Sequence, residues 1–247
     1  MITLYDMGPS SFPESMGGSP HVRKVIFTLN YKSLPFKITT LHFDSIEPTA
    51  KSLNAPPTTT KPDGSPKYTV PFIHDTRTGK SISDSFLIAE YLDKTYPDTP
   101  AVVPKGTGTL QLVFTDVVQR KMMCLMPVLM PKYEEWCSEE LIESRRKVYG
   151  EVLKPPKISE EEERAVWESG RKTFGELAAA YVHSGNSVFV MGGDRPVFAD
   201  FVVASMVVAI KVMFGEESEE WRDVVGWNEG RIGRLVEKVL GYPKVEV

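Results

Sequence analysis

Cysteine and histidine are scarce in this chain, and their scarcity excludes several kinds of site. The 247 residues include two cysteines, Cys124 and Cys137, too few for a disulfide framework and without the spacing of a zinc site. The four histidines are His21, His42, His74 and His183. They are too scattered to suggest shared metal ligation, so we predict no metal and no bound cofactor. Both cysteines are expected to be free, buried thiols.

Excess basic charge and a convincing membrane segment are also missing. The formal net charge of −4 disfavours nucleic acid and anionic membrane surfaces as partners. The first residues, Met1–Tyr5, lack the basic and apolar regions of a signal peptide. The apolar run Val197–Phe214 approaches the length of a membrane span, but Asp200 and Lys211 interrupt it. We therefore predict a cytoplasmic protein in which this run is a buried helix.

The residues around Ser19 and Pro20 give the clearest helix start. Serine is a favoured N-cap and proline a favoured first helical residue. Apolar side chains follow at helical spacing, at Val22, Val25, Ile26 and Leu29. A loop rich in glycine, proline and serine, Met7–Gly18, connects this helix to a predicted first strand, Ile2–Tyr5.

Strands and helices are mixed over the first hundred residues. The remaining predicted strands cover residues 36–43, 71–74 and 80–82, and the last two flank the turn Asp75–Gly79. A second helix begins at Asp84 and ends near Tyr96. This order of elements is the thioredoxin-like α/β arrangement.

Composition changes after residue 97, where prolines and glycines mark a linker. We predict a thioredoxin-like domain at residues 1–97, a linker at 98–108 and an all-helical domain at 109–247. Predicted helices there cover 109–130, 159–183, 216–225 and 230–240, besides the apolar run. In the first of these, Pro127 and Pro131 are expected to mark a kink and the end.

The most informative motif is Val70–Pro71, followed by Asp84–Ser85 at the start of a helix. Proline cannot donate into a sheet, so Pro71 fits the first residue of a strand. If the bond before Pro71 is cis, the backbone N–H and C=O of Val70 turn outward, where an extended peptide can pair with them. Asp84 and Ser85 place a carboxylate, a hydroxyl and free N–H groups at a positive helix end. The combination predicts a main-chain clamp beside a pocket for a zwitterionic amino-acid end.

Val70–Pro71 and Ser83–Leu92 resemble the glutathione-binding half of cytosolic glutathione transferases, and the helical second part extends this resemblance over nearly the whole chain. In that family the residue before the cis-proline pairs with the cysteine backbone of glutathione, and the acid–serine pair holds the γ-glutamyl end. The resemblance therefore implies glutathione as co-substrate, bound by Val70, Pro71, Asp84 and Ser85. The long loop before Ser19 and the proline-rich insert before Val70 look like the fungal FuA class, which is itself similar to bacterial β-etherases.

Ser19 lies where related proteins carry a thiol-activating serine, cysteine or tyrosine. A free thiol has a pKa of about 8.5, and attack on an electrophile needs the thiolate. The resemblance implies that the Ser19 hydroxyl donates to the sulfur, while the helix start adds positive potential. A simple N-cap role for Ser19 is the alternative, and Tyr5 is a rival activator whose place in a strand favours a structural role. Because Ser19–Val22 contains no cysteine, thiol–disulfide chemistry is disfavoured.

Other parts of the site rest on the resemblance alone. The helix that carries Met122, Met126 and Met130 borders the electrophile pocket in the family, and we add Phe12 and Met16 from the long loop. Methionine suits a surface that adapts to varied ligands. Lys51 or Lys67 would meet the glycine carboxylate, and the sequence does not choose between them.

The sequence thus predicts a serine-type glutathione transferase that acts on small hydrophobic or aromatic electrophiles. The resemblance also implies a homodimer. One alternative is a ligandin that binds aromatic compounds with weak catalysis, and others are a glutathione-dependent etherase or peroxidase. A non-catalytic scaffold is disfavoured by the intact Val70–Pro71 and Asp84–Ser85 pairs.

Overall fold

The computed structural model describes residues 1–13, 16–150, 158–185 and 187–245, which form two compact units. The first unit consists of the described parts of Met1–Val102, Trp136–Val152 and Tyr242–Val247. The second consists of those of Val103–Glu135 and Leu153–Gly241.

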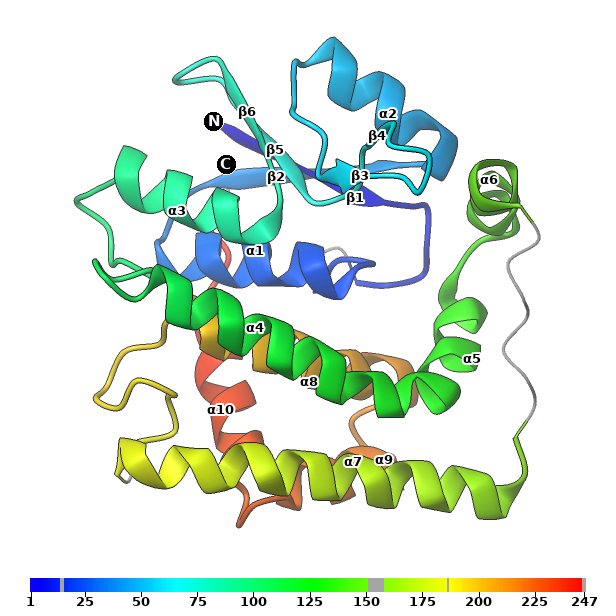
Figure 1. Cartoon of the computed structure of the whole chain (residues 1–247), viewed down its shortest axis with the longest axis vertical. Coiled ribbons are helices and arrows are strands. Elements are labelled where there is room, and N and C mark those ends of the chain that lie inside the picture. The colour runs from blue at the N-terminus through cyan, green and yellow to red at the C-terminus, as the bar shows by residue number, and fades with distance from the viewer. Residues whose placement is uncertain (14–15, 151–157, 186, 246–247) are drawn as a thin grey trace. The chain divides into compact units, whose positions relative to one another are not determined.

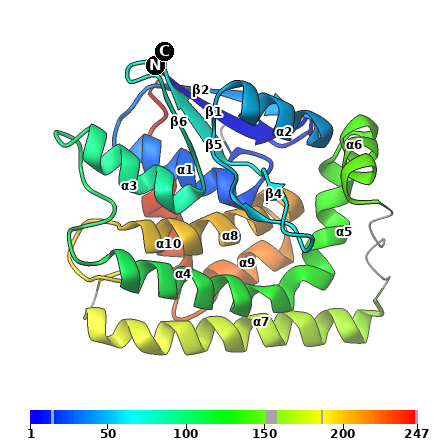
Figure 2. The same cartoon turned by 45° about the horizontal axis from the view of Figure 1, so that its top comes forward.

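The first unit is a mixed sheet with helices on both faces (Figures 1 and 2). Its strands are β1 (Ile2–Met7), β2 (Phe36–Leu41), β5 (Phe72–Asp75) and β6 (Lys80–Ser83), in the order β2-β1-β5-β6. Its helices are α1 (Pro20–Tyr31), α2 (Phe43–Ser52), α3 (Ser85–Thr95) and α6 (Glu139–Tyr149). Figures 1 and 2 show α1 and α3 side by side on one face of the sheet and α2 on the other. This is the thioredoxin-like arrangement predicted from the sequence.

The register of the sheet brings three chain segments together at one end of its strands. Strand β1 runs parallel to β2 and antiparallel to β5, with Tyr5 opposite Phe72. Phe72 in turn lies opposite Ser83, the last residue of β6. The end of β1, the start of β5 and the start of α3 therefore meet at this end of the sheet. The site described below lies there.

The second unit is helical. Its helices are α4 (Gly108–Met122), α5 (Met126–Trp136), α7 (Glu160–Tyr181), α8 (Phe198–Phe214), α9 (Glu219–Gly226) and α10 (Arg231–Leu240). Helix α8 is central, because it packs against α4, α9 and α10. Its buried Asp200 accepts hydrogen bonds from the backbone N–H groups of Val197 and Val190, both at 2.8 Å. In the part of the chain that the structure describes, no helix is long and apolar enough to cross a membrane.

Several predicted elements differ in the structure. Residues 43–52 form helix α2, whereas the sequence predicted that the preceding strand would reach Phe43. The proline-rich insert contains a short antiparallel pair, β3 (Thr59–Thr60) and β4 (Pro66–Lys67). A 3-10 turn, Met123–Leu125, separates α4 from α5, and Pro131 lies inside α5 rather than at its end.

Helix α6 joins the first compact unit from a later part of the chain. It follows the predicted linker at 98–108, yet it packs against α2 and belongs to the first unit. The backbone N–H of Phe43 donates to the hydroxyl of Ser144 at 3.1 Å, and the rings of Phe43 and Tyr149 meet edge to face. These contacts are the physical reason why a later segment joins the first unit.

Candidate functional site

Ser19 is the N-cap of helix α1, as predicted. Its side-chain oxygen accepts a hydrogen bond from the backbone N–H of His21 at 3.2 Å, and the residue is buried. A hydroxyl can accept and donate at once. Its own proton has no acceptor among the described residues, so Ser19 keeps one hydrogen bond to offer to a ligand.

The loop before Ser19 is held by Asp6, which the sequence analysis did not single out. The Asp6 carboxylate accepts hydrogen bonds from the backbone N–H groups of Met7 and Gly18, at 2.7 and 2.6 Å. Burial raises the pKa of Asp6 to about 6, although these hydrogen bonds and the charge of Arg23 act to lower it. Gly17 has a φ of +66°, and a Cβ there would lie 3.1 Å from an Asp6 oxygen, which explains the need for glycine.

Arg23 fastens the same loop from the helix side. Its guanidinium donates to the backbone carbonyls of Met16 and Gly17, at 2.8 and 3.1 Å. Arg23 and Lys24 are each only 1% exposed, although they lie on a helix whose neighbouring positions are apolar. Two adjacent charged residues between the apolar Val22 and Val25 were the signal in the sequence that could have identified them as buried residues with structural partners.

Val70–Pro71 is a cis peptide, and Val70 has free backbone groups. Neither its N–H nor its C=O is hydrogen-bonded to another residue in the described part of the chain. Because β5 begins at Phe72, directly after this peptide, both groups lie at the end of the sheet where β1 ends. An extended peptide can pair with them as an added strand would.

Asp84 caps helix α3 and faces the cis-proline. One carboxylate oxygen accepts from the backbone N–H groups of Phe86 and Leu87, at 2.8 and 3.1 Å. The backbone N–H of Asp84 donates to the carbonyl of Pro71 at 3.3 Å. The second carboxylate oxygen of Asp84 and the hydroxyl of Ser85 have no hydrogen-bond partner among the described residues. The structure thus brings together the two motifs that the sequence predicted to act together.

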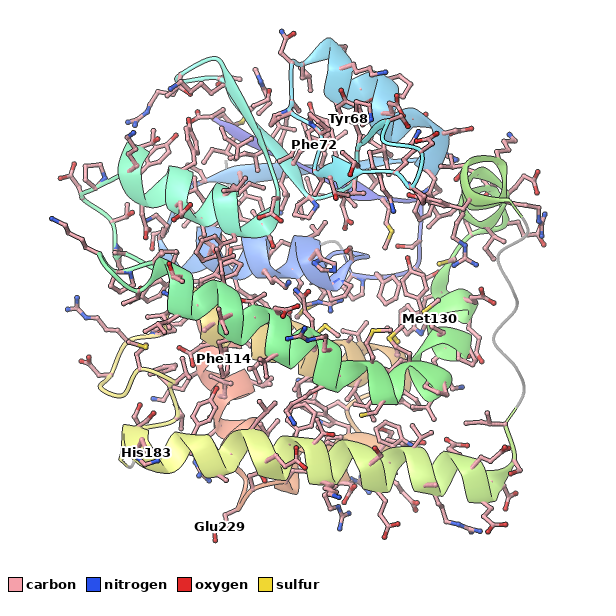
Figure 3. All side chains as sticks on the ribbon, viewed as in Figure 1. Tyr68, Phe72, Phe114, Met130, His183 and Glu229 are labelled. Carbon is pink, nitrogen blue, oxygen red and sulfur yellow. The ribbon has the colours of Figure 1, made fainter. Side chains whose placement is uncertain are left out.

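Tyr5, the rival activator, is half-buried and packs against the interior of the first unit. Its ring stacks on Phe72 with the centroids 4.4 Å apart and the planes at 8°. It packs against the cluster formed by Ile46, Ala50, Ala55 and Phe72, and Tyr68 contacts the same cluster (Figure 3). Desolvation raises the pKa of Tyr5, so its hydroxyl keeps its proton at neutral pH.

The residues predicted to line the electrophile pocket belong to two different units. In the first unit, Phe12 is 8% exposed and stacks on Trp136 at 5.2 Å, while Met16 is half-buried. In the second, Met122 is fully buried, and Met126 and Met130 on α5 are half-buried. Met130 is labelled in Figure 3. A shared pocket wall built from these five residues therefore stays a prediction.

A groove of about 880 Å³ lies within the first unit. Aromatic side chains of Phe43, Tyr68 and Tyr149 line it, together with Lys51 and Lys67. The two lysines differ, because Lys51 forms an ion pair with Glu47 at 2.6 Å, whereas Lys67 lies 5.5 Å from the centre of the Tyr149 ring. Lys67 has no carboxylate partner among the described residues.

Cys124 and Cys137 form no disulfide bond, and both are half-buried, whereas the sequence predicted buried thiols. Among the described residues, no three side chains of the metal-binding types His, Cys, Asp and Glu cluster together.

Sequence models of the two domains of one family match this chain. The model described as the glutathione S-transferase N-terminal domain matches residues 18–95, and that of the C-terminal domain matches residues 109–242. The chain belongs to the glutathione S-transferase family.

Solved structures and a curated relative indicate which class of glutathione S-transferase this chain is similar to. A glutathione S-transferase of Ceriporiopsis subvermispora, crystallised in complex with glutathione, is 33% identical, with a TM-score of 0.87 over 98% of this chain and 97% of that one. Glutathione transferase GSTFuA3 from Phanerochaete chrysosporium is 29% identical, with a TM-score of 0.86 over 100% and 98%. The glutathione S-transferase-like protein ustS of Aspergillus flavus is 28% identical over 90% of this chain and 83% of its own length. Within the family, the match is to the fungal FuA class, as predicted from the sequence.

Proposed function

We propose that this protein is a serine-type glutathione transferase that conjugates glutathione to small hydrophobic or aromatic electrophiles. The observation that carries this proposal is the state of Ser19, whose oxygen is held by the His21 N–H while its proton is free for a ligand. The family membership and the glutathione-bound relative support glutathione as the thiol.

Glutathione would be held at three points of the first unit. The free N–H and C=O of Val70 would pair with the cysteinyl backbone, and the open carboxylate oxygen of Asp84 would accept from the γ-glutamyl amine. The hydroxyl and N–H of Ser85 would donate to the γ-glutamyl carboxylate at the positive end of α3. For the glycine carboxylate we choose Lys67 over Lys51, because Lys51 is already paired with Glu47.

Ser19 would then lower the pKa of the bound thiol. A hydrogen bond to a charged group contributes about 1.5–3 kcal/mol, and a helix N-terminus about 0.3–1 kcal/mol. At about 1.36 kcal/mol for each pKa unit, the hydroxyl alone would lower the thiol pKa by one to two. The thiolate attacks the electrophilic carbon, a carbon–sulfur bond forms, and the leaving group departs with the electron pair of its bond.

The decisive experiment measures glutathione binding and thiol ionisation in one series. Calorimetric titration should give saturable binding of glutathione, and the ultraviolet absorbance of the complex should show a thiolate below the pH at which free glutathione ionises. Conjugation of a chromogenic aromatic halide should follow the thiolate fraction. Absence of binding would refute the proposal, and binding without a shifted thiol pKa would refute the role of Ser19.

A ligandin role is the second candidate, and the aromatic groove of the first unit favours it. Phe43, Tyr68 and Tyr149 offer ring faces in a groove of about 880 Å³, within the size range of small-molecule sites. A ligandin would bind flat aromatic compounds equally well in wild type and in Ser19→Ala, and would turn over every electrophile poorly. A transferase would lose turnover on that substitution.

Two further proposals rest on the family alone. We propose a homodimer that works in the cytoplasm, where glutathione is the main small thiol. Light scattering coupled to size-exclusion chromatography would test the dimer, and fractionation of the source cells would test the location.

A further inference from the structure

The groove of the first unit is bounded by α2, by the β3–β4 pair and by the end of α6 (Figure 2). At the end of α6, Val148 and Tyr149 line the groove and are 45% and 46% exposed. The ring of Tyr149 meets that of Phe43, at the start of α2, edge to face. The groove therefore offers apolar and aromatic surface that a ligand can bury.

Three lysines line the groove, and two of them share one carboxylate. Lys51 and Lys61 lie 2.6 and 3.7 Å from carboxylate oxygens of Glu47. Lys67 has no carboxylate partner among the described residues, and its ammonium lies 5.5 Å from the centre of the Tyr149 ring. An open ammonium beside a ring face fits an aromatic group that carries an anion.

The two aspartates of the groove have partners of their own. Asp44 lies 4.0 Å from the ammonium of Lys147. Asp63 accepts hydrogen bonds from the backbone N–H and the hydroxyl of Ser65, at 2.9 and 2.7 Å. Lys67 is therefore the charge that the described part of the groove leaves open to an anion.

The groove begins where the proposed glutathione site ends. The γ-glutamyl end is assigned to the start of α3, and the glycine end to Lys67, three residues before Val70. A peptide bound in this direction runs antiparallel to residues 67–70, with its cysteine beside Val70 and its glycine beside Thr69. The next residue of a longer peptide would lie beside Tyr68, which is labelled in Figure 3 and lines the groove.

We propose that the groove receives the C-terminal extension of a peptide thiol longer than glutathione, with an aromatic residue after the glycine. The inference rests on the proposed transferase function and deepens it, because it names a class of thiol substrate, γ-Glu-Cys-Gly-X with X aromatic. The ring of X packs on Tyr68 and Tyr149, and its terminal carboxylate takes the place of the glycine carboxylate at Lys67. The thiol stays beside Ser19, so the conjugation step is the same as with glutathione.

The binding test compares glutathione, its C-terminal amide, γ-Glu-Cys-Gly-Ala and γ-Glu-Cys-Gly-Phe by calorimetric titration. The Phe peptide should bind about tenfold more tightly than the Ala peptide, because only its ring can pack on the rings of the groove. The amide, which has no terminal carboxylate for Lys67, should bind most weakly. Equal Kd values for the Phe and Ala peptides would overturn the proposal.

A variant locates the extension. Tyr149→Ala should reduce the preference for the Phe peptide to about twofold, and the Kd for glutathione should change by less than about twofold. Because Tyr149 is exposed at the last residue of α6, the fold should persist. Met191→Ala, at a residue of the second unit that is 52% exposed, is the matched control and should keep the full preference. A full preference in Tyr149→Ala would place the ring elsewhere and overturn the proposal.

A spectroscopic readout does not depend on any variant. In the wild-type complex with the Phe peptide, nuclear Overhauser effects should connect the peptide ring to the rings of Tyr68 and Tyr149. Their absence from a saturated complex would remove the extension from the groove.

Kinetics separate this inference from the proposed function. With one electrophile, kcat should agree within about twofold for the Phe and Ala peptides, and KM should be about tenfold lower for the Phe peptide, because the groove contacts are the same before and during the reaction. A protein that conjugates glutathione but does not distinguish the two peptides would refute the extension alone. If phenylacetate also bound in the groove beside saturating glutathione, that result would assign the groove to the ligandin role instead. A protein that binds none of the thiols would refute the proposed function, and the extension with it.

Discussion

The backbone N–H of Asp84 donates to the carbonyl oxygen of Pro71 at 3.3 Å, and this hydrogen bond joins the two halves of the proposed glutathione site. Asp84 has a φ of +77°, a region that residues other than glycine rarely adopt. Such a conformation costs about 1–3 kcal/mol and persists only when its surroundings fix it. Here hydrogen bonds to the Pro71 carbonyl and from two helix N–H groups hold Asp84 in this conformation. The second carboxylate oxygen is therefore held in a fixed position.

Asp84→Asn should weaken glutathione binding with little loss of stability. Asparagine is also a good N-cap and tolerates a positive φ, so the start of α3 should survive. The charge that would hold the γ-glutamyl amine is lost, at a cost of about 1.5–3 kcal/mol, or roughly ten- to hundredfold in Kd. Calorimetric titration with glutathione measures this change.

The matched control for this change is a helix cap elsewhere in the first unit. Ser138 caps α6 by accepting from the backbone N–H of Leu141 at 3.1 Å. Ser138→Ala should lower the free energy of unfolding by about 1 kcal/mol and leave the affinity for glutathione unchanged. Full affinity in Asp84→Asn would remove Asp84 from the site.

Ser19→Ala should raise the pKa of the bound thiol by about one to two and lower turnover at neutral pH, while glutathione affinity is nearly kept. The loss of the α1 cap should also cost about 1 kcal/mol of stability. The thiolate absorbance of the complex, followed against pH, reports the pKa directly. Ser159→Ala, which removes the cap of α7, is the control for stability alone.

Tyr5→Phe should leave the thiol titration and the turnover unchanged. The ring stacks on Phe72, so packing is the contribution that we expect from it. Phenylalanine retains that packing. A variant with a normal fold that no longer forms the thiolate would transfer the activating role from Ser19 to Tyr5.

Elements with a strong local pattern were the ones that the sequence could predict. Helix α1 has a serine cap, a proline at its first position and apolar residues at helical spacing. Helix α2 buries only Ile46 and Ala50 and contains Pro48, so its pattern is weak, and it depends on packing against the sheet and α6. Pro127 lies in the first turn of α5, where no intrahelical hydrogen bond is lost, whereas Pro131 is the sixth residue and removes one backbone hydrogen bond of the helix, which nevertheless continues to Trp136.

The residues of the candidate site also divide into those that the sequence could predict and those that it could not. Val70–Pro71, Asp84–Ser85 and the N-cap Ser19 could be predicted, because their residue types by themselves indicate a strand start or a helix cap. The roles of Asp6, Arg23 and Lys24 depend on partners that the fold supplies, such as the N–H of Gly18 and the imidazole of His21. A sequence shows such charges but not what they face.

The pKa of Asp6 predicts a loss of stability as the pH rises from about 4 to 6. Burial raises this pKa from 3.8 to about 6 in the folded protein, so in that window the native state holds a proton that the unfolded chain has released. Unfolding is then favoured by rising pH, by up to about 3 kcal/mol for this group. Asp6→Asn should remove this slope.

The measurement is the free energy of unfolding by urea at several pH values, compared between Asp6→Asn and wild type. Asp200 has a pKa raised to about 7 by burial, which gives a slope of the same sign in both proteins, so the difference between them isolates Asp6. Asp98→Asn, at an exposed carboxylate, should behave as wild type. Parallel curves for Asp6→Asn and wild type would show that Asp6 has the same pKa in the folded and the unfolded protein.

Lys67→Met should reduce glutathione affinity more than Lys51→Met. Lys67 lies on the chain three residues before Val70 and has no carboxylate partner among the described residues, whereas Lys51 is neutralised by Glu47 at 2.6 Å. An exposed charge pair with the glycine carboxylate contributes about 0.5–1 kcal/mol, or roughly two- to fivefold in Kd. The ethyl ester of glutathione, in which the glycine carboxylate is masked, makes the test specific. Wild type should prefer glutathione over the ester by that factor, Lys51→Met should keep the preference, and Lys67→Met should bind both equally. A preference that persists in Lys67→Met and disappears in Lys51→Met would reverse the assignment of the two lysines.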